Sequence, residues 1–463
     1  MRSLSSYKVF NLYLPVLVEQ CLATVSTMLG TMLVAGLGDY AIASIGMVDQ
    51  LNFLFINILV CIGTGVTAIV SQRVGSGNIQ DAQKSAENAI SLAIYGSIII
   101  CIFLILFKGF ILNMLFGKAD PAVLEAGSTY LFYTSLSLPF LTLFNIFTGI
   151  RRATGDNFSP LMGSFSSNVC YVGITIFCMK VLDLGINSVG YGLILSRMVS
   201  SFILFMFIKF KPYELTIRKL PLKLDYQALK PVLSISIPNA MDSMIFNGGK
   251  ILVQVFMSQM GTASLSANTI VMSLANLIQL PGRTIQVTCV PQTGRSFGTG
   301  DMEKTKKLML TQVLMSNCTQ FCMSIVFYLF CQDIYSFYTQ DPLTLQYVKE
   351  LATMMLIMAP IFWATSFALP GSLRATGDAK FTMRVSATSL FLCRIPLSWL
   401  FGVYFELGVH GIWIGMYIDW IFRSVFYFSR IFSKKWHAKP VDNKNNLNQE
   451  KDSLEPKKEE VIK

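Results

Sequence analysis

Long apolar runs separated by short polar segments dominate this chain. Residues 91–107 and 314–330 are typical runs, close to the roughly 20 residues that a helix needs to span a bilayer. The pattern predicts twelve helices, at residues 10–37, 45–71, 86–107, 127–149, 160–180, 187–208, 231–259, 265–291, 307–331, 349–370, 382–404 and 410–431. Because only helices and closed barrels satisfy backbone hydrogen bonds in lipid, we expect an all-α integral membrane protein.

The two halves of the chain repeat each other. The segment Arg152-Ala-Thr-Gly-Asp156 recurs as Arg374-Ala-Thr-Gly-Asp378, at an offset of 222 residues (374 − 152). An offset of 223 relates three further pairs, Pro15 with Pro238, Gly75 with Gly298, and Leu184 with Leu407. Six helices in each copy place both copies in the same orientation, so a parallel 6+6 repeat is expected. Internal repeats of hydrophobic chains are typical of secondary transporters.

The helix pattern also predicts the domain boundaries. We expect an N-terminal six-helix bundle at residues 1–209, a cytoplasmic linker at 210–230, and a C-terminal six-helix bundle at 231–432. Residues 433–463 are rich in Lys, Asn, Glu and Asp and poor in large apolar side chains. Such a segment buries too little apolar surface to fold, so a disordered cytoplasmic tail is predicted.

Basic residues in the loops predict the orientation. Most Lys and Arg residues between helices fall on one side, whereas the other side holds only Lys108, Lys118, Lys180 and Lys349. Cytoplasmic loops are richer in Lys and Arg, so we expect a multi-pass protein of the plasma membrane with both termini in the cytoplasm.

Composition narrows the functional class. Charged residues make up 14% of the chain, against roughly a quarter in soluble domains. The net charge of +11 mostly reflects the loop bias, and no basic segment with interleaved aromatic residues suggests nucleic-acid binding. The ten cysteines form no CxxC pair and there are two histidines, so we expect no metal site and no cofactor. With no HExxH or comparable acid–base motif, an enzyme is not expected.

Three sets of residues together resemble the MATE family of multidrug and toxic-compound exporters. They are the repeated RATGD turns, the glycine loops at residues 75–78 and 298–301, and the helix openings at Pro15 and Pro238. The resemblance covers residues 8–432 and implies a V-shaped pair of six-helix bundles. It also implies a secondary active efflux antiporter for drugs, organic cations or metabolites, driven by protons or sodium. A small-molecule substrate, a bilayer environment and a monomer are expected.

A lipid-linked oligosaccharide or polysaccharide flippase of the same superfamily is the alternative. Flippases have more helices and a strongly cationic cavity. The helix count argues against this alternative, whereas Arg197, Lys250, Arg283 and Arg394 within helices argue for it.

The repeated turns have a simple geometric interpretation. Gly155 and Gly377 permit a positive φ, and Asp156 and Asp378 are placed to cap the next helix. We interpret these residues, with Arg152 and Arg374 at the membrane edge, as hinge and cap motifs rather than as substrate contacts.

The resemblance also implies carboxylates at three coupling positions, where this chain has Gly30, Val172 and Trp363. Val172 follows Asn168 by four residues, as the family's aspartate follows an asparagine. The choice between proton and sodium coupling is therefore open. If sodium is used, the side-chain oxygens of Asn168 and Asn145 are candidate ligands.

Other intramembrane charges are candidates for coupling or substrate binding. Glu19 and Asp242 each follow a helix-opening proline by four residues and are repeat mates. Ionisable groups in lipid are costly and are therefore functional candidates. Each carboxylate could attract a cation or take up a proton, or simply bond to serines or a neighbouring helix.

Cationic side chains form a second group of candidates. Lys250 and Arg283 could pair with Asp242 in an ion-pair network that substrate competes for, and Arg423 lies four residues after Asp419 on one helix face. These inward cations leave room for an anionic or zwitterionic substrate.

Overall fold

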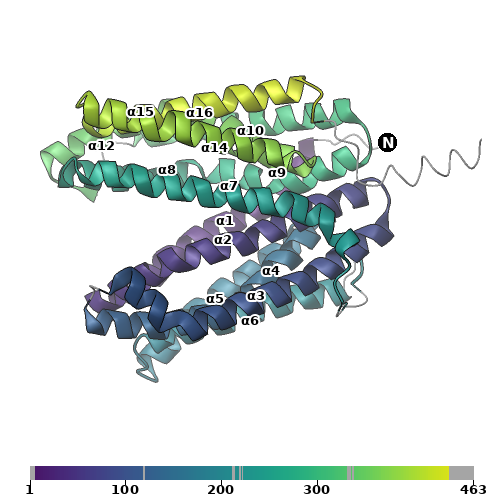
Figure 1. The fold of residues 1–463 in the computed structure, drawn as a ribbon, viewed down its shortest axis with the longest axis horizontal. Coiled ribbons are helices and arrows are strands. Elements are labelled where there is room, and N and C mark those ends of the chain that lie inside the picture. Colours follow the sequence, from purple (N-terminus) through teal and green to yellow (C-terminus); the bar gives the residue numbers. More distant parts are fainter. Residues whose placement is uncertain are drawn as a thin grey trace, which may run out of the picture.

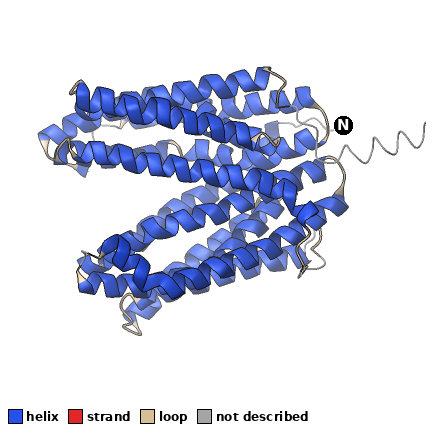
Figure 2. Ribbon diagram, viewed as in Figure 1, coloured by secondary structure: helices blue, strands red, loops and turns tan. Residues whose placement is uncertain are grey.

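The structure is a computed structural model that describes residues 6–117, 120–210, 214–217, 221, 223–330, 335 and 338–436. Its secondary structure within these ranges is entirely helical (Figure 2). The first half contributes α1 (Ser6–Ala35), α2 (Asp39–Gly75), α3 (Ile79–Phe116), α4 (Pro121–Ala153), α5 (Phe158–Lys180) and α6 (Asn187–Phe210). Each of these six helices is long and apolar enough to cross a membrane over most of its length.

The second half forms its spans less regularly. Its first elements are α7 (Tyr226–Ser258), α8 (Thr262–Ile278), α9 (Leu280–Gly298), α10 (Met302–Leu329) and α12 (Pro342–Met358). They are followed by η1 (Ala359–Ala368), α13 (Leu369–Ala375), α14 (Ala379–Ser389), η2 (Leu390–Arg394), α15 (Ile395–Trp399), η3 (Leu400–Tyr404) and α16 (Gly408–Phe432). The stretches η1, η2 and η3 are π-helical and continue the helices on either side of them. Counting each continuous or bent run once, the described residues form six helical runs in this half. Two of them, Pro342–Ala375 and Ala379–Tyr404, are long and apolar enough to cross a membrane, as is the bent pair of α8 and α9 taken together.

Figure 1 shows the two halves as separate helical groups arranged in a V. They meet at the end that contains the start of α1 and spread apart toward the other end. The all-α, two-bundle fold predicted from the sequence is thus confirmed. The helices extend beyond the predicted apolar runs, for example to 38 residues in α3.

Close backbone contacts hold the bundles together at the apex of the V. A Cβ added to Gly75 would lie 2.2 Å from the backbone oxygen of Arg295, and one added to Gly298 would lie 2.0 Å from that of Gln72. Only glycine permits such an approach, so the repeated glycine loops serve as contact points between the bundles. The Gln72 side chain also donates to the Ala375 carbonyl across this junction at 2.6 Å.

One sequence prediction needs adjustment here. The single helix expected at residues 265–291 is a pair, α8 and α9, bent by 54° at Gln279. The halves also differ at their prolines, because Pro139 lies inside the continuous helix α4 whereas Pro360 is the second residue of the π-helical stretch η1.

The predicted tail begins later than composition indicated. Residues 437–463 of it lie outside the described part of the chain. Trp436, however, is fully buried against Phe297, and its indole nitrogen donates to the Ile431 carbonyl at 2.8 Å. Its large apolar ring therefore extends the folded chain past Ser433.

Candidate functional site

The two RATGD turns share the conformation of their glycine but differ in the role of their aspartate. Gly155 and Gly377 have φ values of +89° and +93°, which the turns require. The Asp156 carboxylate accepts from the backbone nitrogens of Phe158 and Ser159 at 3.0 and 3.1 Å.

The capping predicted for Asp378 does not occur. Asp378 makes no side-chain cap, because its carboxylate pairs with Arg430 of α16 at 2.6 Å.

The arginines of the same turns form two repeat-related ion pairs. Arg152 Nη2 lies 2.6 Å from Glu19 Oε2 in the first half. In the second half, Arg374 Nη1 lies 3.4 Å from Asp242 Oδ2 and also donates to the Asn239 side chain. These arginines are therefore not only hinge elements at the membrane edge, as the sequence suggested. Each is the partner of an intramembrane carboxylate.

A central cavity of about 450 Å³ lies between the bundles. Its charged lining residues are Arg152 from the first half and Asp242, Arg374 and Arg423 from the second. Its polar uncharged lining includes Asn57, Thr64, Asn145, Asn239, Asn247 and Gln286. Glu19 is not among the lining residues and is 7% exposed behind Arg152. Of the two candidate carboxylates, Asp242 is therefore the one that a substrate in this cavity can reach.

A second cavity of about 400 Å³, here called the C-bundle cavity, lies within the second half. Lys250, Arg283 and Arg394 line it, and no Asp or Glu is among its lining residues. The pairing of Asp242 with Lys250 or Arg283 that the sequence left open is not the one observed, because Asp242 pairs with Arg374 in the other cavity. Arg283 instead donates to the Asn276 side chain at 2.5 Å.

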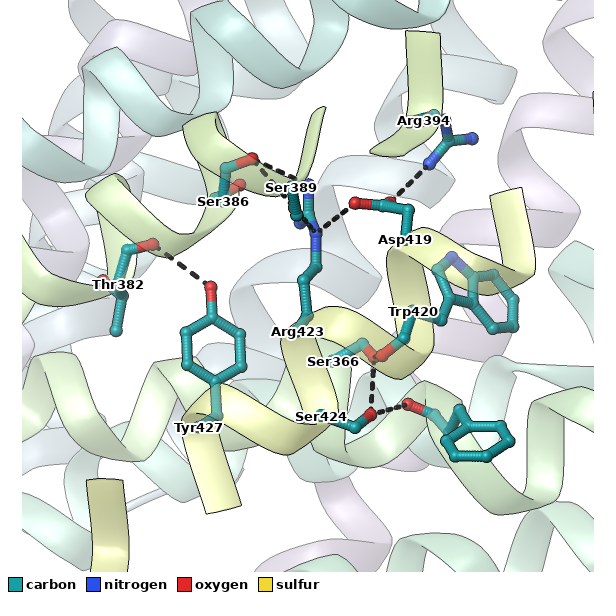
Figure 3. A network of polar contacts seen from close by, with 11 residues as sticks. Ser366, Thr382, Ser386, Ser389, Arg394, Asp419, Trp420, Arg423, Ser424 and Tyr427 are labelled. Carbon is teal, nitrogen blue, oxygen red and sulfur yellow. Dashed lines mark hydrogen bonds and ion pairs between the residues drawn. The ribbon is translucent and has the colours of Figure 1, made fainter. Parts of the chain in front are cut away.

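Behind the C-bundle cavity, one buried carboxylate holds two arginines (Figure 3). Asp419 is 0% exposed and lies 3.4 Å from Arg394 and 3.0 Å from Arg423. Arg423 also donates to the Ser389 hydroxyl at 2.8 Å. The i,i+4 arrangement of Asp419 and Arg423 thus belongs to a larger network that fixes α14, η2 and α16 relative to one another.

Two aromatic rings separate the two cavities. Phe246 and Phe367 line both, and their ring centroids lie 5.9 Å apart in an edge-to-face arrangement. The Phe246 ring has three cations around it, with Lys250 at 4.8 Å, Arg394 at 5.2 Å and Arg423 at 4.6 Å from its centroid.

The remaining candidates from the sequence lie apart from the central cavity. Asn168 on α5 has a buried amide nitrogen without a hydrogen-bond partner and lines neither cavity. At Gly30 an added Cβ would lie 3.2 Å from the Tyr171 hydroxyl, so the Tyr171 ring occupies the space that a carboxylate there would need. Trp363 lines the C-bundle cavity.

Sequence reasoning missed a polar site inside the first bundle. The Tyr130 hydroxyl donates to Asp49 at 3.1 Å, and Arg197 of α6 donates to Ser137 at 2.5 Å. A signal for Asp49 was present, since it is an isolated carboxylate within an apolar run. Among the described residues, no group of three His, Cys, Asp or Glu side chains is placed to hold a metal ion.

Comparisons with known proteins agree with this architecture. The MatE family model matches the chain twice, at residues 15–177 and 238–400, with the two matches offset by 223 residues (238 − 15). The probable multidrug resistance protein NorM of Thermotoga maritima is 24% identical over 449 residues, covering 94% of each chain.

Two solved structures share the fold. An outward-facing conformation of a multidrug resistance MATE family transporter of the MOP superfamily superposes with a TM-score of 0.85 at 15% identity, covering 92% of this chain and 96% of that one. A MOP superfamily transporter from Pyrococcus furiosus, described with a binding pocket of reverse polarity that suggests a different function, has a TM-score of 0.83 at 17% identity over the same shares. The duplicated family match, which covers most of both bundles, shows that the chain belongs to the MatE family and is a multi-pass membrane transporter.

Proposed function

We propose that this transporter is a secondary active efflux antiporter that exports drugs, organic cations or metabolites through the central cavity in exchange for protons. The observation that supports the proposal most directly is the ion pair between Asp242 and Arg374 in the cavity wall. The name of the Thermotoga maritima relative, a probable multidrug resistance protein, agrees with export of drugs.

The ion pair offers a chemical basis for exchange. When Asp242 is ionised, its attraction to Arg374 is strong in a low-dielectric setting. A proton on Asp242 removes that attraction and frees Arg374 to move. Proton binding and substrate binding then bias the same pair of side chains, so the two are linked reciprocally. Glu19 and Arg152 repeat this arrangement at 2.6 Å in the other bundle.

Sodium coupling is the main alternative. Sodium requires several converging oxygens, and the Asn145 side chain in the central cavity is the nearest candidate from the sequence. The carboxylate-free positions Gly30 and Val172 make such a cage less favourable than a single titrating group.

Everted vesicles with an imposed gradient test the proposal. We expect dye export to follow a pH gradient in the absence of sodium, and Asp242→Asn to abolish it, because an amide cannot exchange the proton. Glu19→Gln should slow export to a lesser degree, and Lys307→Gln on the exposed start of α10 is the control. Full export by Asp242→Asn under a pH gradient, or export that follows sodium alone, contradicts proton exchange at this site.

The flippase alternative has one observation in its favour, the cationic C-bundle cavity with Lys250, Arg283 and Arg394. A flippase would translocate a fluorescent lipid-linked pyrophosphate in proteoliposomes without an ion gradient. Absence of such movement, together with gradient-dependent dye export, favours the antiporter.

We further propose that the transporter works as a monomer in the plasma membrane with both termini in the cytoplasm, so that the V opens outward. A fluorescent protein fused to the C-terminus that matures only in the cytoplasm tests this orientation. Fluorescence is expected, and a dark but fully expressed fusion contradicts it.

A further inference from the structure

The cationic side chains at the C-bundle cavity outnumber the carboxylates around it. Lys250, Arg283 and Arg394 line it, and Asp419 behind the wall is shared between Arg394 and Arg423. Counting these five groups leaves three positive charges without a carboxylate, and none of the Asp and Glu residues that the structure describes lines the cavity. Cations inside a membrane domain are costly unless they are paired, so this surplus makes the cavity attractive to a negatively charged molecule.

Lys250 and Arg283, which have no ion pair with any described residue, are more accessible than Arg394, which has one. Arg394 is 6% exposed and is held by Asp419, whereas Lys250 is exposed in the cavity and contacts the Phe246 ring. Arg283 is half-buried and donates to the neutral Asn276 side chain. Lys250 and Arg283 are therefore free to donate to a bound molecule.

The rest of the wall favours a flat apolar body. Trp363, Trp413 and Trp420 line the cavity together with Phe246, Phe367 and Met257. A cavity of about 400 Å³ is in the range that holds a small organic ligand. Asn268 and Gln254 add polar groups that can orient it.

From these observations we propose that the C-bundle cavity binds a small aromatic organic anion, with its carboxylate or similar acidic group between Lys250 and Arg283 and its ring among the tryptophans. This proposal rests on the proposed export function, because the bound anion would be a transported substrate. It assigns a substrate class to a second site. Because Phe246 and Phe367 also line the central cavity, an anion there would lie one aromatic layer away from the Asp242–Arg374 pair.

The tryptophans provide a direct readout of binding. Purified transporter in nanodiscs is titrated with para-nitrobenzoate, a nitroaromatic anion that quenches tryptophan fluorescence, and in parallel with the cation para-nitrobenzyltrimethylammonium. Three of the five tryptophans line the cavity, so saturable quenching by the anion is expected at concentrations where the cation quenches only by collision.

Charge variants then locate the site. Lys250→Gln should weaken binding of para-nitrobenzoate about tenfold, because it removes a charge-assisted hydrogen bond. Arg283→Gln should act in the same direction, and Lys250→Glu should reverse the preference and admit the cation. The matched control is Lys307→Gln, a lysine exposed outside both cavities, which should leave the anion's Kd unchanged.

The outcomes separate this site from the export proposal. Equal quenching by anion and cation, or an unchanged Kd in both Lys250→Gln and Arg283→Gln, overturns the anion site. Because binding to purified protein needs no ion gradient, saturable anion binding alongside failed dye export in vesicles refutes only the export proposal. Dye export without anion binding refutes only the anion site.

Discussion

The two bundles share one ion-pair design but differ in the charge that they enclose. Glu19–Arg152 and Asp242–Arg374 are repeat mates and pair in both halves. The cations of the second bundle, by contrast, have no counterparts. At an offset of 223 residues, Lys250, Arg283, Arg394 and Arg423 correspond to Thr27, Val60, Tyr171 and Ser200.

The first bundle likewise has charged residues that the second bundle lacks. Its polar residues Asp49 and Arg197 correspond to Met272 and Trp420, which both line the C-bundle cavity. The ion pairs that the two halves share therefore indicate a function common to both bundles near the junction of the V. The charged residues that differ indicate that the interior of each bundle has its own function.

The largest effect should come from breaking the network that only the second bundle has. Asp419→Asn leaves Arg394 and Arg423 buried without a counter-charge and should cost about 3–5 kcal/mol of stability. Asp49→Asn in the first bundle is the matched variant, and a smaller effect is expected because the new amide oxygen can still accept from the Tyr130 hydroxyl. Thermal unfolding in detergent measures both, and equal midpoints would remove the distinction between the bundles.

A second, smaller effect should come from the shared junction. Gly75→Ala and Gly298→Ala place a methyl group against backbone oxygens and should each cost about 1–3 kcal/mol by forcing the bundles apart. Gly96→Ala is the control, because nothing lies within 4 Å of its added Cβ. If the junction is symmetric in function as well as in sequence, the two variants lower the unfolding midpoint by similar amounts, and one silent variant contradicts that symmetry.

The aromatic wall gives a third comparison. Phe246→Leu keeps an apolar side chain but removes the ring that three cations surround, so a loss of about 1 kcal/mol beyond the packing cost is expected. Phe147→Leu in the first bundle removes a buried ring that contacts another ring, Phe205, and serves as the packing reference. The idea fails if both variants shift the unfolding midpoint by the same amount.

The smallest effect should be at the helix caps outside the membrane. Asp120 caps α4 through the Ala122 nitrogen, whereas Asp341 accepts from both the nitrogen and the hydroxyl of Thr344 at the start of α12. The Thr344 hydroxyl, followed by its backbone N–H, lowers the pKa of Asp341 below its usual 3.8.

A carboxylate whose pKa is lowered by folding stabilises the fold at pH values above its usual pKa. That stabilisation is lost as the pH falls through the lowered pKa. Asp341→Asn should therefore reduce the unfolding midpoint slightly at neutral pH, and the difference from wild type should disappear in strong acid. A difference that persists unchanged in acid would show that the carboxylate charge is not its source.

The sequence was sufficient for the architecture because apolar runs and a constant repeat offset are properties of the chain itself. It also identified Glu19, Asp242, Lys250 and Arg283 as unusual, since charge in an apolar run is visible without coordinates. Partner choice could not be predicted, because Asp242 meets Arg374 only through the packing of α7 near α13, over 130 residues apart in sequence. For the same reason the capping predicted for Asp378 was replaced by a pair with Arg430.

Two π-helical stretches of the second bundle, η2 and η3, lie where the repeat has a small irregularity. Arg374 and Leu407 are separated by 33 positions (407 − 374), whereas Arg152 and Leu184 are separated by 32 (184 − 152). The extra residue falls in the segment that contains η2 and η3, whereas α5 in the first half is regular.

In a regular helix, one inserted residue would turn everything after it by about 100°. A π turn absorbs the insertion locally and preserves the helical phase. Arg394, the last residue of η2, thereby still faces Asp419. A one-residue deletion there would put the arginine out of phase with its carboxylate.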